Sequence, residues 1–372
     1  MPTRVLASLT REPRPPAKLT CVVAPTGYGK TVLSTAVFKH CAVHGVQGYW
    51  IPLDDRDTSV ERVLGRLETG LGNPGGEVHP TQALIHGDEP LESRIEELLD
   101  VVAQLPDPSL VFIDNLGYCP DETLGYLLDR LAFRTPASVS FMFSSTHQIP
   151  LNSARAKLEG RLREVGIAEL SLGEDEVRAF FGAELCAQIG AAGVDSVLRQ
   201  TEGWPAAVRL AQIILTGAEQ PRDALARFSG ADEDLSDLLN RQVLAGFSSA
   251  TRLFLLQIAS LRTFCVDLCL HATGDKEAAQ HLALLLRRNV FVIPLDRNRN
   301  WYRLHGLFRE FLIEESQRTL SAAQRSVVLE RAAGWCERGG LWQDAIDYAL
   351  AAGSKSLASA VLERVAPMFV RE

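Results

Sequence analysis

The strongest constraint on the fold of this chain is one short stretch near its start. Residues 19–24 are apolar and rich in β-branched side chains, which predicts a strand. Residues 31–43 have helical spacing before Gly45 ends the segment. Between them stands the sequence Ala24-Pro25-Thr26-Gly27-Tyr28-Gly29-Lys30-Thr31. A strand, a glycine-containing turn and a helix in this order predict the opening of an α/β domain.

The turn also has the chemistry of a phosphate-binding loop, although Ala24 stands at the first glycine position of that pattern. Glycines allow backbone N–H groups to turn inward around an anion, and the following helix presents its positive end to the same anion. The Lys30 ammonium suits the β- and γ-phosphates, and the Thr31 hydroxyl suits Mg²⁺. An ordinary glycine turn is the alternative, but the flanking strand and helix favour the phosphate loop. The predicted nucleotide-binding residues are Pro25, Thr26, Gly27, Tyr28, Gly29, Lys30, Thr31 and Val32.

A second candidate site follows the apolar run at residues 110–113, where Asp114 and Asn115 come at the predicted strand's carboxyl end. This segment resembles a Walker B strand, whose terminal acid holds Mg²⁺, although apolar residues followed by Asp are common. Thr31 and Asp114 are therefore the predicted metal ligands. Asn115 occupies the place of a second acid that would orient the attacking water, and an amide is a poor base. With Lys30, Asp114 and Asn115 as catalytic candidates, we expect slow ATP hydrolysis at best.

Two further polar groups follow predicted strands. Asp54, Asp55 and Asp57 come after the strand at residues 49–53, where open α/β sheets bind ligands, but solvated loop charges explain them equally well. Residues 144–147 (Ser-Ser-Thr-His) end the strand at 139–144. They could sense a γ-phosphate or cap the next segment.

The order of elements predicts several domains. Strands alternate with helices up to about residue 171, which indicates a mostly parallel sheet with helices on both faces. The last strand is expected at residues 168–170. Residues 72–90 lack periodicity and are expected to form a mobile loop.

From Leu172 the pattern is helical, with separate helices predicted at 174–185, 194–201 and 205–215 and a flexible linker at 217–232. Further helices lead to a ribbon at 289–295 and 301–304, which suggests a winged helix. The helical segments after it suggest the start of a helical-repeat arm. The predicted domains are a P-loop domain (1–171), a helical domain with linker (172–232), a winged-helix domain (233–318) and the start of the arm (319–372).

Composition excludes some functions. The chain is 46% hydrophobic and 23% charged, which is typical of a soluble globular protein. Its longest apolar runs are shorter than the ~20 residues of a membrane helix, and the start does not resemble a secretory signal, so we expect a cytoplasmic protein. A net charge of −8 makes this stretch a poor DNA binder. Cysteine usage favours reduced core thiols, and Cys265, Cys269 and His271 alone have a hint of metal-site spacing.

Taken together, the motifs resemble those of the signal-transduction ATPases with numerous domains (STAND), most closely the nucleotide-binding portion of MalT-like, LuxR-family large ATP-binding regulators. The resemblance rests on the phosphate loop and on segments Trp50-Ile51-Pro52-Leu53-Asp54, Phe112-Ile113-Asp114, Thr201-Glu202-Gly203-Trp204-Pro205-Ala206-Ala207, His305-Gly306-Leu307-Phe308-Arg309-Glu310-Phe311-Leu312 and Ala345-Ile346-Asp347-Tyr348-Ala349-Leu350-Ala351-Ala352-Gly353.

The resemblance implies a transcriptional regulator held closed around ADP, with Pro205 on the adenine side and His305 on the diphosphate. An inducer and ATP would then open it for self-assembly. It also implies that the inducer and DNA bind through C-terminal repeats and a helix-turn-helix, which are absent before Glu372. Asn115 and Thr146-His147 depart from the family pattern of a second acid and an arginine. The alternatives are a P-loop enzyme, such as a kinase or motor ATPase, and a scaffold that has lost its nucleotide.

Overall fold

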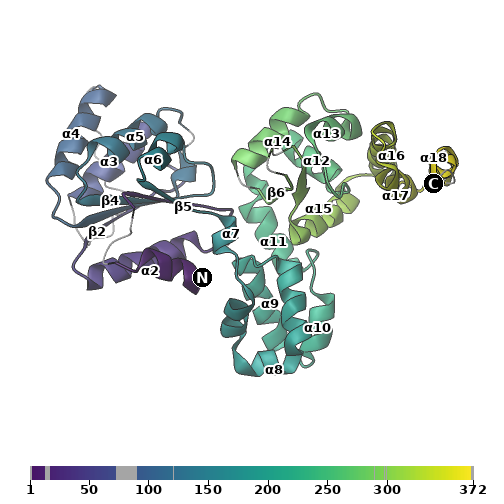
Figure 1. The fold of residues 1–372 in the computed structure, drawn as a ribbon, viewed down its shortest axis with the longest axis horizontal. Coiled ribbons are helices and arrows are strands. Elements are labelled where there is room, and N and C mark those ends of the chain that lie inside the picture. Colours follow the sequence, from purple (N-terminus) through teal and green to yellow (C-terminus); the bar gives the residue numbers. More distant parts are fainter. Residues whose placement is uncertain are drawn as a thin grey trace. The chain divides into compact units, whose positions relative to one another are not determined.

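The computed structural model describes residues 2–12, 17–72, 90–119, 121–288, 290–296, 298 and 300–369. The chain divides into two compact units, each with its own core. The first contains Met1–Ala187 and Gly203–Arg209, and the second contains Gln188–Glu202 and Leu210–Glu372. Figure 1 shows both units and labels many of their elements.

The first unit is built on a parallel sheet, as predicted. In the described part of the chain the sheet has five strands in the order β2-β3-β4-β1-β5, and every neighbouring pair is parallel. The strands are β1 Leu19–Val23, β2 Gln47–Pro52, β3 Ser109–Asp114, β4 Val139–Ser145 and β5 Leu162–Val165. Because all strands run in one direction, the segments that follow β1, β2, β3 and β4 meet at one edge of the sheet.

Helices cover both faces of this sheet. They are α1 Thr3–Leu9, α2 Lys30–Val43, α3 Val60–Leu71, α4 Leu91–Ala103, η1 Leu116–Tyr118, α5 Leu124–Arg134, α6 Ser153–Leu158 and α7 Ile167–Leu170. Figure 1 shows α2 below the sheet and α3, α4 and α5 above it.

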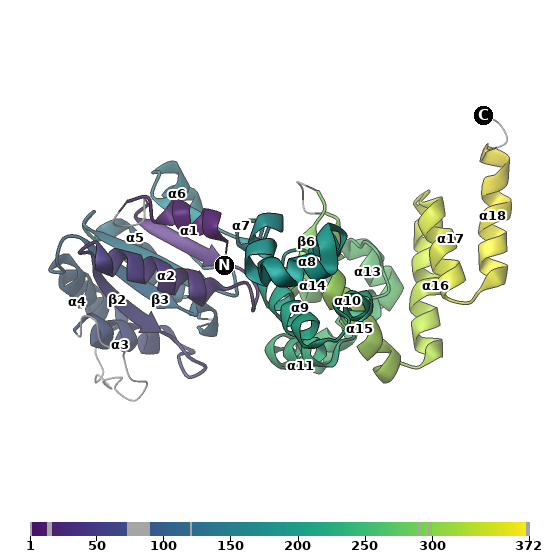
Figure 2. The same cartoon turned by 90° about the horizontal axis from the view of Figure 1, so that it is seen from below.

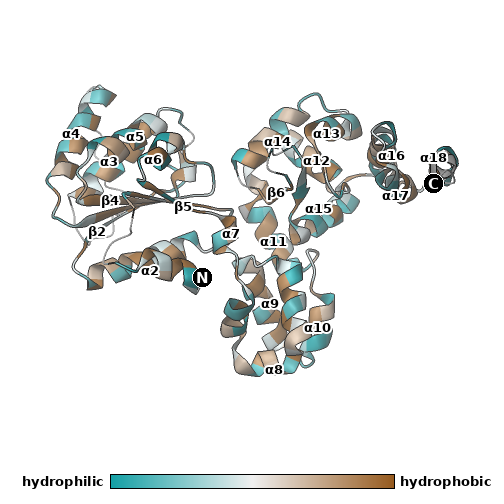
Figure 3. Cartoon of the chain, in the orientation of Figure 1, coloured by the Kyte–Doolittle hydropathy of each residue, from teal (hydrophilic) through white to brown (hydrophobic). Residues whose placement is uncertain are grey.

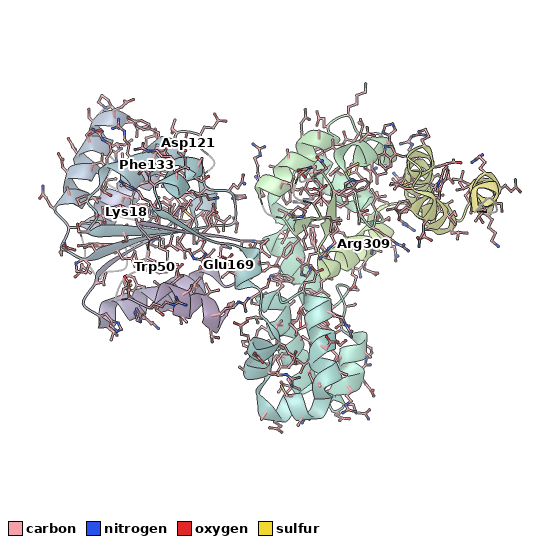
Figure 4. All side chains as sticks on the ribbon, viewed as in Figure 1. Lys18, Trp50, Asp121, Phe133, Glu169 and Arg309 are labelled. Atoms are coloured by element: carbon pink, nitrogen blue, oxygen red, sulfur yellow. The ribbon has the colours of Figure 1, made fainter. Side chains whose placement is uncertain are left out.

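Alternate residues of each strand face opposite sides of the sheet. Val111 and Ile113 of β3 join the core with α3, α4 and α5. Phe112 lies on the other side with Phe38 of α2 and Trp50 of β2, at ring-centroid distances of 5.1 and 5.3 Å. Figure 4 labels Trp50, which lies between the sheet and α2. Figure 3 shows hydrophobic residues along the strands, whereas the helices on both faces of the sheet mix hydrophobic and hydrophilic residues.

The structure contradicts one prediction for this unit, and another falls mostly outside the residues that it describes. The last strand is Leu162–Val165, and the predicted strand at 168–170 is wrong because these residues belong to α7. The Glu169 carboxylate accepts the Gly166 N–H at 2.8 Å, so this acid caps a helix start. Most of the predicted loop at 72–90 lies outside the described residues.

The second unit is mainly helical. Its elements are the end of α8 (Glu174–Thr201) and most of α9 (Pro205–Gly217), then α10 Pro221–Arg227, α11 Glu233–Gln242, η2 Leu244–Gly246, α12 Ser249–Ile258, α13 Val266–Thr273, α14 Ala278–Arg287, β6 Val292–Pro294, β7 Tyr302–Leu304, α15 Gly306–Thr319, α16 Ala322–Arg338, α17 Trp342–Ala351 and α18 Lys355–Phe369.

The predicted winged helix is present in this unit. β6 and β7 form the antiparallel ribbon that follows α14, and Phe264 adds a bridge to Tyr302. Buried Phe254, Phe308 and Phe311 pack in the core of this domain. The helices α16, α17 and α18 lie side by side after it (Figure 2).

Two helical predictions were wrong in part. The helices predicted at 174–185 and 194–201 are one element, α8, in which Gly182 and Gly190 have positive φ angles of 78° and 71°. The predicted flexible linker at 217–232 contains α10. A Cβ on Gly230 of this segment would lie 2.2 Å from the Leu307 carbonyl, so the segment is packed against α15. No helix among the described residues is long and apolar enough to cross a membrane.

Candidate nucleotide site

The loop between β1 and α2 turns at two glycines with left-handed backbone. Gly27 and Gly29 have φ angles of 83° and 75°, which side chains rarely tolerate. Helix α2 begins at Lys30, so the first amides of the helix have no acceptor one turn earlier in the same helix. In this stretch Tyr28 is buried and Val32 is 57% exposed. The loop can therefore present several N–H groups to a phosphate.

Lys30 is a buried cation whose partners are neutral. Its Nζ donates to the Ala24 carbonyl at 2.8 Å and to the Pro25 carbonyl at 3.0 Å, and the residue is only 7% exposed. Burial lowers the pKa of Lys30 to about 8, and the nearby Asp114 carboxylate opposes this shift. Among the described residues no carboxylate lies within ion-pair distance of Nζ. A buried ammonium with this environment suits an incoming anion.

The structure brings the predicted metal ligands Thr31 and Asp114 together. The Thr31 hydroxyl donates to Asp114 Oδ2 at 3.0 Å. Asp114 Oδ1 accepts the Asn115 N–H at 3.1 Å and also a hydrogen bond from the Ser144 hydroxyl. A hydroxyl and a carboxylate are hard oxygen ligands, and Mg²⁺ usually takes only one or two protein ligands beside phosphate and water. These residues therefore fit Mg²⁺.

Ser144 is the residue of the 144–147 group that reaches this site. It is 1% exposed and joins the ends of β3 and β4 through Asp114 and through the Asn115 N–H, which it accepts at 3.2 Å. The Ser145 hydroxyl accepts the His147 N–H at 2.9 Å, so this second serine caps the turn. Capping thus describes Ser145, and the sensing of a γ-phosphate by this group stays a prediction.

Asn115 turns away from Asp114 in a left-handed conformation with a φ of 63°. Its Nδ2 donates to the Leu53 carbonyl at 3.5 Å. Asparagine tolerates this conformation better than most residues. The amide therefore links the ends of β3 and β2 and offers no proton acceptor of carboxylate strength.

The aspartates after β2 form a structural network. Asp57 is 3% exposed, and its Oδ1 accepts from Arg66 Nε at 3.0 Å. Arg66 Nη2 also donates to Asp54 Oδ2 at 3.0 Å. Hydrogen bonds from the Arg56 side chain hold the pKa of Asp54 well below its usual value. The solvated-charge interpretation is wrong for Asp57, because a partner for this buried carboxylate lies nine residues further on.

Pro205 and His305 lie in different units. Pro205 starts α9, and its two neighbours contact the phosphate loop: Trp204 Nε1 donates to the Thr26 carbonyl at 3.2 Å, and the Ala206 N–H donates to the Gly27 carbonyl at 3.1 Å. Sequence spacing gave no signal for these two contacts, because 178 residues separate Trp204 from Thr26.

His305 is 1% exposed and precedes α15 in the second unit. Its Nε2 lies 3.0 Å from the Thr201 carbonyl, and burial lowers its pKa. Next to it, Glu202 binds Arg303 through two nitrogens at 2.8 and 2.7 Å and accepts the Gly306 N–H at 2.8 Å. The end of α8 thus fixes the start of α15. The predicted contact of His305 with a diphosphate stays a prediction.

The cysteine cluster has local structural partners. The Cys265 Sγ accepts the Leu268 N–H at 3.4 Å at the start of α13, and Cys269 is buried. His271 Nδ1 lies 2.9 Å from the Asp267 carbonyl. Cys265 and His271 therefore have partners within α13, and Cys269 lies in the core.

The sheet, its glycine loop and the ribbon define the class of protein by its architecture: a parallel α/β domain with a P-loop, followed by helices and a winged-helix domain. Residues 240–324 match the family model described as the MalT winged helix domain. The chain is similar to the serine/threonine-protein kinase PknK of Mycobacterium tuberculosis and of Mycobacterium bovis, with 26% identity over 363 residues. These residues cover 93% of this chain and 31% of each relative, so the chain spans less than a third of their length.

Two solved structures resemble the chain at low identity. One is a STAND protein with a tetratricopeptide repeat sensor from Pyrococcus horikoshii, with 14% identity, a TM-score of 0.37 and coverage of 99% of this chain and 50% of that one. The other is the Aeropyrum pernix ORC1 protein in complex with DNA, with 15% identity, a TM-score of 0.42 and coverage of 85% and 93%.

Proposed function

We propose that this chain is the nucleotide-controlled switch of a MalT-like, LuxR-family transcriptional regulator. The observation that carries the proposal is the meeting of Lys30, Thr31 and Asp114 at the carboxyl edge of one parallel sheet. Lys30 and the loop Pro25–Val32 would hold the phosphates of ATP or ADP, and Thr31 and Asp114 would hold Mg²⁺. The MalT-type winged helix supports the regulator assignment.

The switch would work through four domains with the boundaries predicted above. In the resting state Pro205 would lie at the adenine and His305 at the diphosphate, so ADP would hold the domains closed. An inducer and ATP would favour an open state that self-assembles, through their differential affinity for the two states.

The amide side chain of Asn115 favours a nucleotide-controlled switch over an enzyme that hydrolyses ATP rapidly. A general base beside the γ-phosphate would need a carboxylate or similar group, whereas Asn115 is an amide directed to the Leu53 carbonyl. We expect the chain to retain ADP tightly and to hydrolyse ATP slowly.

The test starts with the nucleotide content of the purified chain. Denaturation followed by chromatography should release about one ADP per chain, and multiple turnover with Mg²⁺-ATP should be slow. Rapid turnover would favour a P-loop kinase or motor ATPase instead. A chain without nucleotide that also fails to bind added ADP would indicate a scaffold.

The closed state gives a second test, His305→Ala. Loss of the imidazole should speed the release of a fluorescent ADP analogue by about tenfold, as for one lost hydrogen bond to a charged group, and should promote self-assembly. His281→Ala is the matched control, since His281 is another buried histidine of the same domain, with Nδ1 3.1 Å from the Thr251 hydroxyl. Equal release rates for wild type and His305→Ala would contradict the role of His305.

A further inference from the structure

The phosphate loop is held from outside by Trp204 and the first turn of α9, which directly follows Trp204. Its Thr26 and Gly27 carbonyls accept hydrogen bonds from Trp204 Nε1 at 3.2 Å and from the Ala206 N–H at 3.1 Å. Pro205 has no N–H, so Ala206 carries the first amide of α9, and that amide finds its acceptor in the loop. Two successive carbonyls of the loop are thus fixed by one short segment.

Gly27 lies tightly against this segment. A Cβ at Gly27 would be 2.7 Å from both the Ala206 Cβ and Trp204 Nε1. Real Cβ atoms essentially never make non-bonded contacts this short. Trp204 itself is 1% exposed. The glycine is therefore required here for two reasons, its positive φ and the close approach of α9.

Fixing a carbonyl also fixes the next amide. The peptide unit is planar and trans, so the C=O of one residue and the N–H of the next point in opposite directions. When α9 holds the Thr26 and Gly27 carbonyls, the N–H groups of Gly27 and Tyr28 must point away from α9. An N–H is also a stronger hydrogen-bond donor when the carbonyl of the same peptide unit accepts a hydrogen bond.

We propose that Trp204 is a positioning residue for nucleotide phosphates: its indole N–H and the Ala206 N–H aim the Gly27 and Tyr28 amides at the diphosphate. The inference rests on the proposed function, because it assumes that the loop binds a nucleotide. It adds a specific consequence, since withdrawal of the first turn of α9 would free both peptide planes and weaken phosphate binding. By linkage, a bound diphosphate holds α9 against the loop to the same extent.

The experiment compares phosphate-bearing and phosphate-free ligands. In Trp204→Phe the indole N–H is lost, and the affinity for ADP and for pyrophosphate, measured by competition against a fluorescent ADP analogue, should fall by about tenfold. The affinity for adenosine should change by less than about twofold, because adenosine has no phosphate for the amides to bind. Trp335→Phe is the matched control: its indole N–H donates to Asp267 at 2.6 Å in the second unit, and ADP affinity should be unchanged.

A second variant separates the hydrogen bond from the shape of the side chain. Replacing Trp204 by 3-benzothienylalanine through amber suppression exchanges the N–H for sulfur and keeps the two-ring shape. It should fold like the wild type and show the same loss for ADP and pyrophosphate. This variant decides the matter if Trp204→Phe fails to fold.

The outcomes are distinct. A wild type without affinity for ADP would overturn the proposed function, and this inference with it. A wild type that binds ADP, together with a benzothienyl variant that binds it equally well, would overturn the inference alone. Equal losses for adenosine and ADP would overturn it too, because Trp204 would then act on the fold or the base and not on the phosphates.

Discussion

Two buried cations of the first unit are balanced in different ways. Arg66 of α3 is 3% exposed and pairs with the carboxylates of Asp57 and Asp54, each at 3.0 Å. Lys30 of α2 is 7% exposed, and its nearest acceptors are two neutral carbonyls. The segments that carry the acids and the phosphate loop both follow strands at the same edge of the sheet.

The difference separates a charge that is neutralised within the protein from one that we propose serves a ligand. The Arg66 charge is neutralised within the protein, so the group contributes to folding whether or not a ligand is present. The Lys30 charge is only partly compensated, through the more distant Asp114, and burial lowers its pKa to about 8. A bound diphosphate would complete the neutralisation of Lys30, which predicts that the two residues respond oppositely to mutation.

The largest expected effect is on stability. Arg66→Ala leaves the buried Asp57 carboxylate without its cation and should lower the free energy of unfolding by about 3–5 kcal/mol, measured by urea denaturation. Arg62→Ala on the same helix is the control: its guanidinium is exposed and donates to the Arg56 carbonyl, so the cost should be about 0.5 kcal/mol or less. Similar losses of unfolding free energy for both variants would mean that the buried Arg66 charge contributes no more to stability than an exposed arginine.

The next effect is on binding. Lys30→Met keeps most of the aliphatic stem and removes the charge, so ADP affinity should fall by about 100-fold, the upper end for hydrogen bonds to charged groups. The free energy of unfolding without nucleotide should change by less than about 1 kcal/mol, because a buried cation is lost as well. Lys39→Met, an exposed lysine on the same helix, should leave ADP affinity unchanged. A large loss of stability with unchanged ADP affinity would give Lys30 the role assigned to Arg66.

The same contrast explains how much could be predicted from sequence. The strand β1, the phosphate loop, α2 and Asp114 were predicted because their signals are local: apolar runs, glycines and one charged residue at a strand end. The pairing of Asp57 with Arg66 was missed because a loop and a helix turn bring the two together, and charge alone does not distinguish a paired aspartate from a solvated one.

Features that depend on residues far apart in the chain gave even less signal in the sequence. β5 pairs with β1 alone, and its residues Leu162-Arg-Glu-Val are half polar, as an edge strand allows. The apolar residues of α7 therefore gave a stronger local signal for a strand than the residues of β5 did. The hydrogen bond from Trp204 to the Thr26 carbonyl depends on the tertiary fold. From the local sequence alone, a tryptophan before a helix is interpreted as an ordinary core residue.

The smallest predicted effect concerns pH, and it follows from the lowered pKa of Lys30. Without nucleotide the group loses its proton near pH 8, whereas in the unfolded chain it does so near 10.5. Between these values the unfolded chain binds more protons, so the contribution of Lys30 to stability rises with pH. ADP affinity should change in the opposite direction. The terminal phosphate is already ionised, since a phosphate monoester loses its second proton near about pH 6, and the ammonium that binds it disappears above pH 8.

ADP affinity should therefore fall by about twofold from pH 7 to 8 and by about tenfold from pH 7 to 9, because Lys30 is half deprotonated at its pKa of about 8 and each further pH unit reduces the charged fraction about tenfold. Titration of a fluorescent ADP analogue over this range measures the fall. Lys30→Met removes the titrating group, so its weak affinity should not vary with pH, and the difference in unfolding free energy between the two proteins should grow from pH 8 to 10. Constant ADP affinity of the wild type up to pH 9.5 would show that Lys30 stays charged, and Lys30 would then resemble Arg66 in charge as well as in burial.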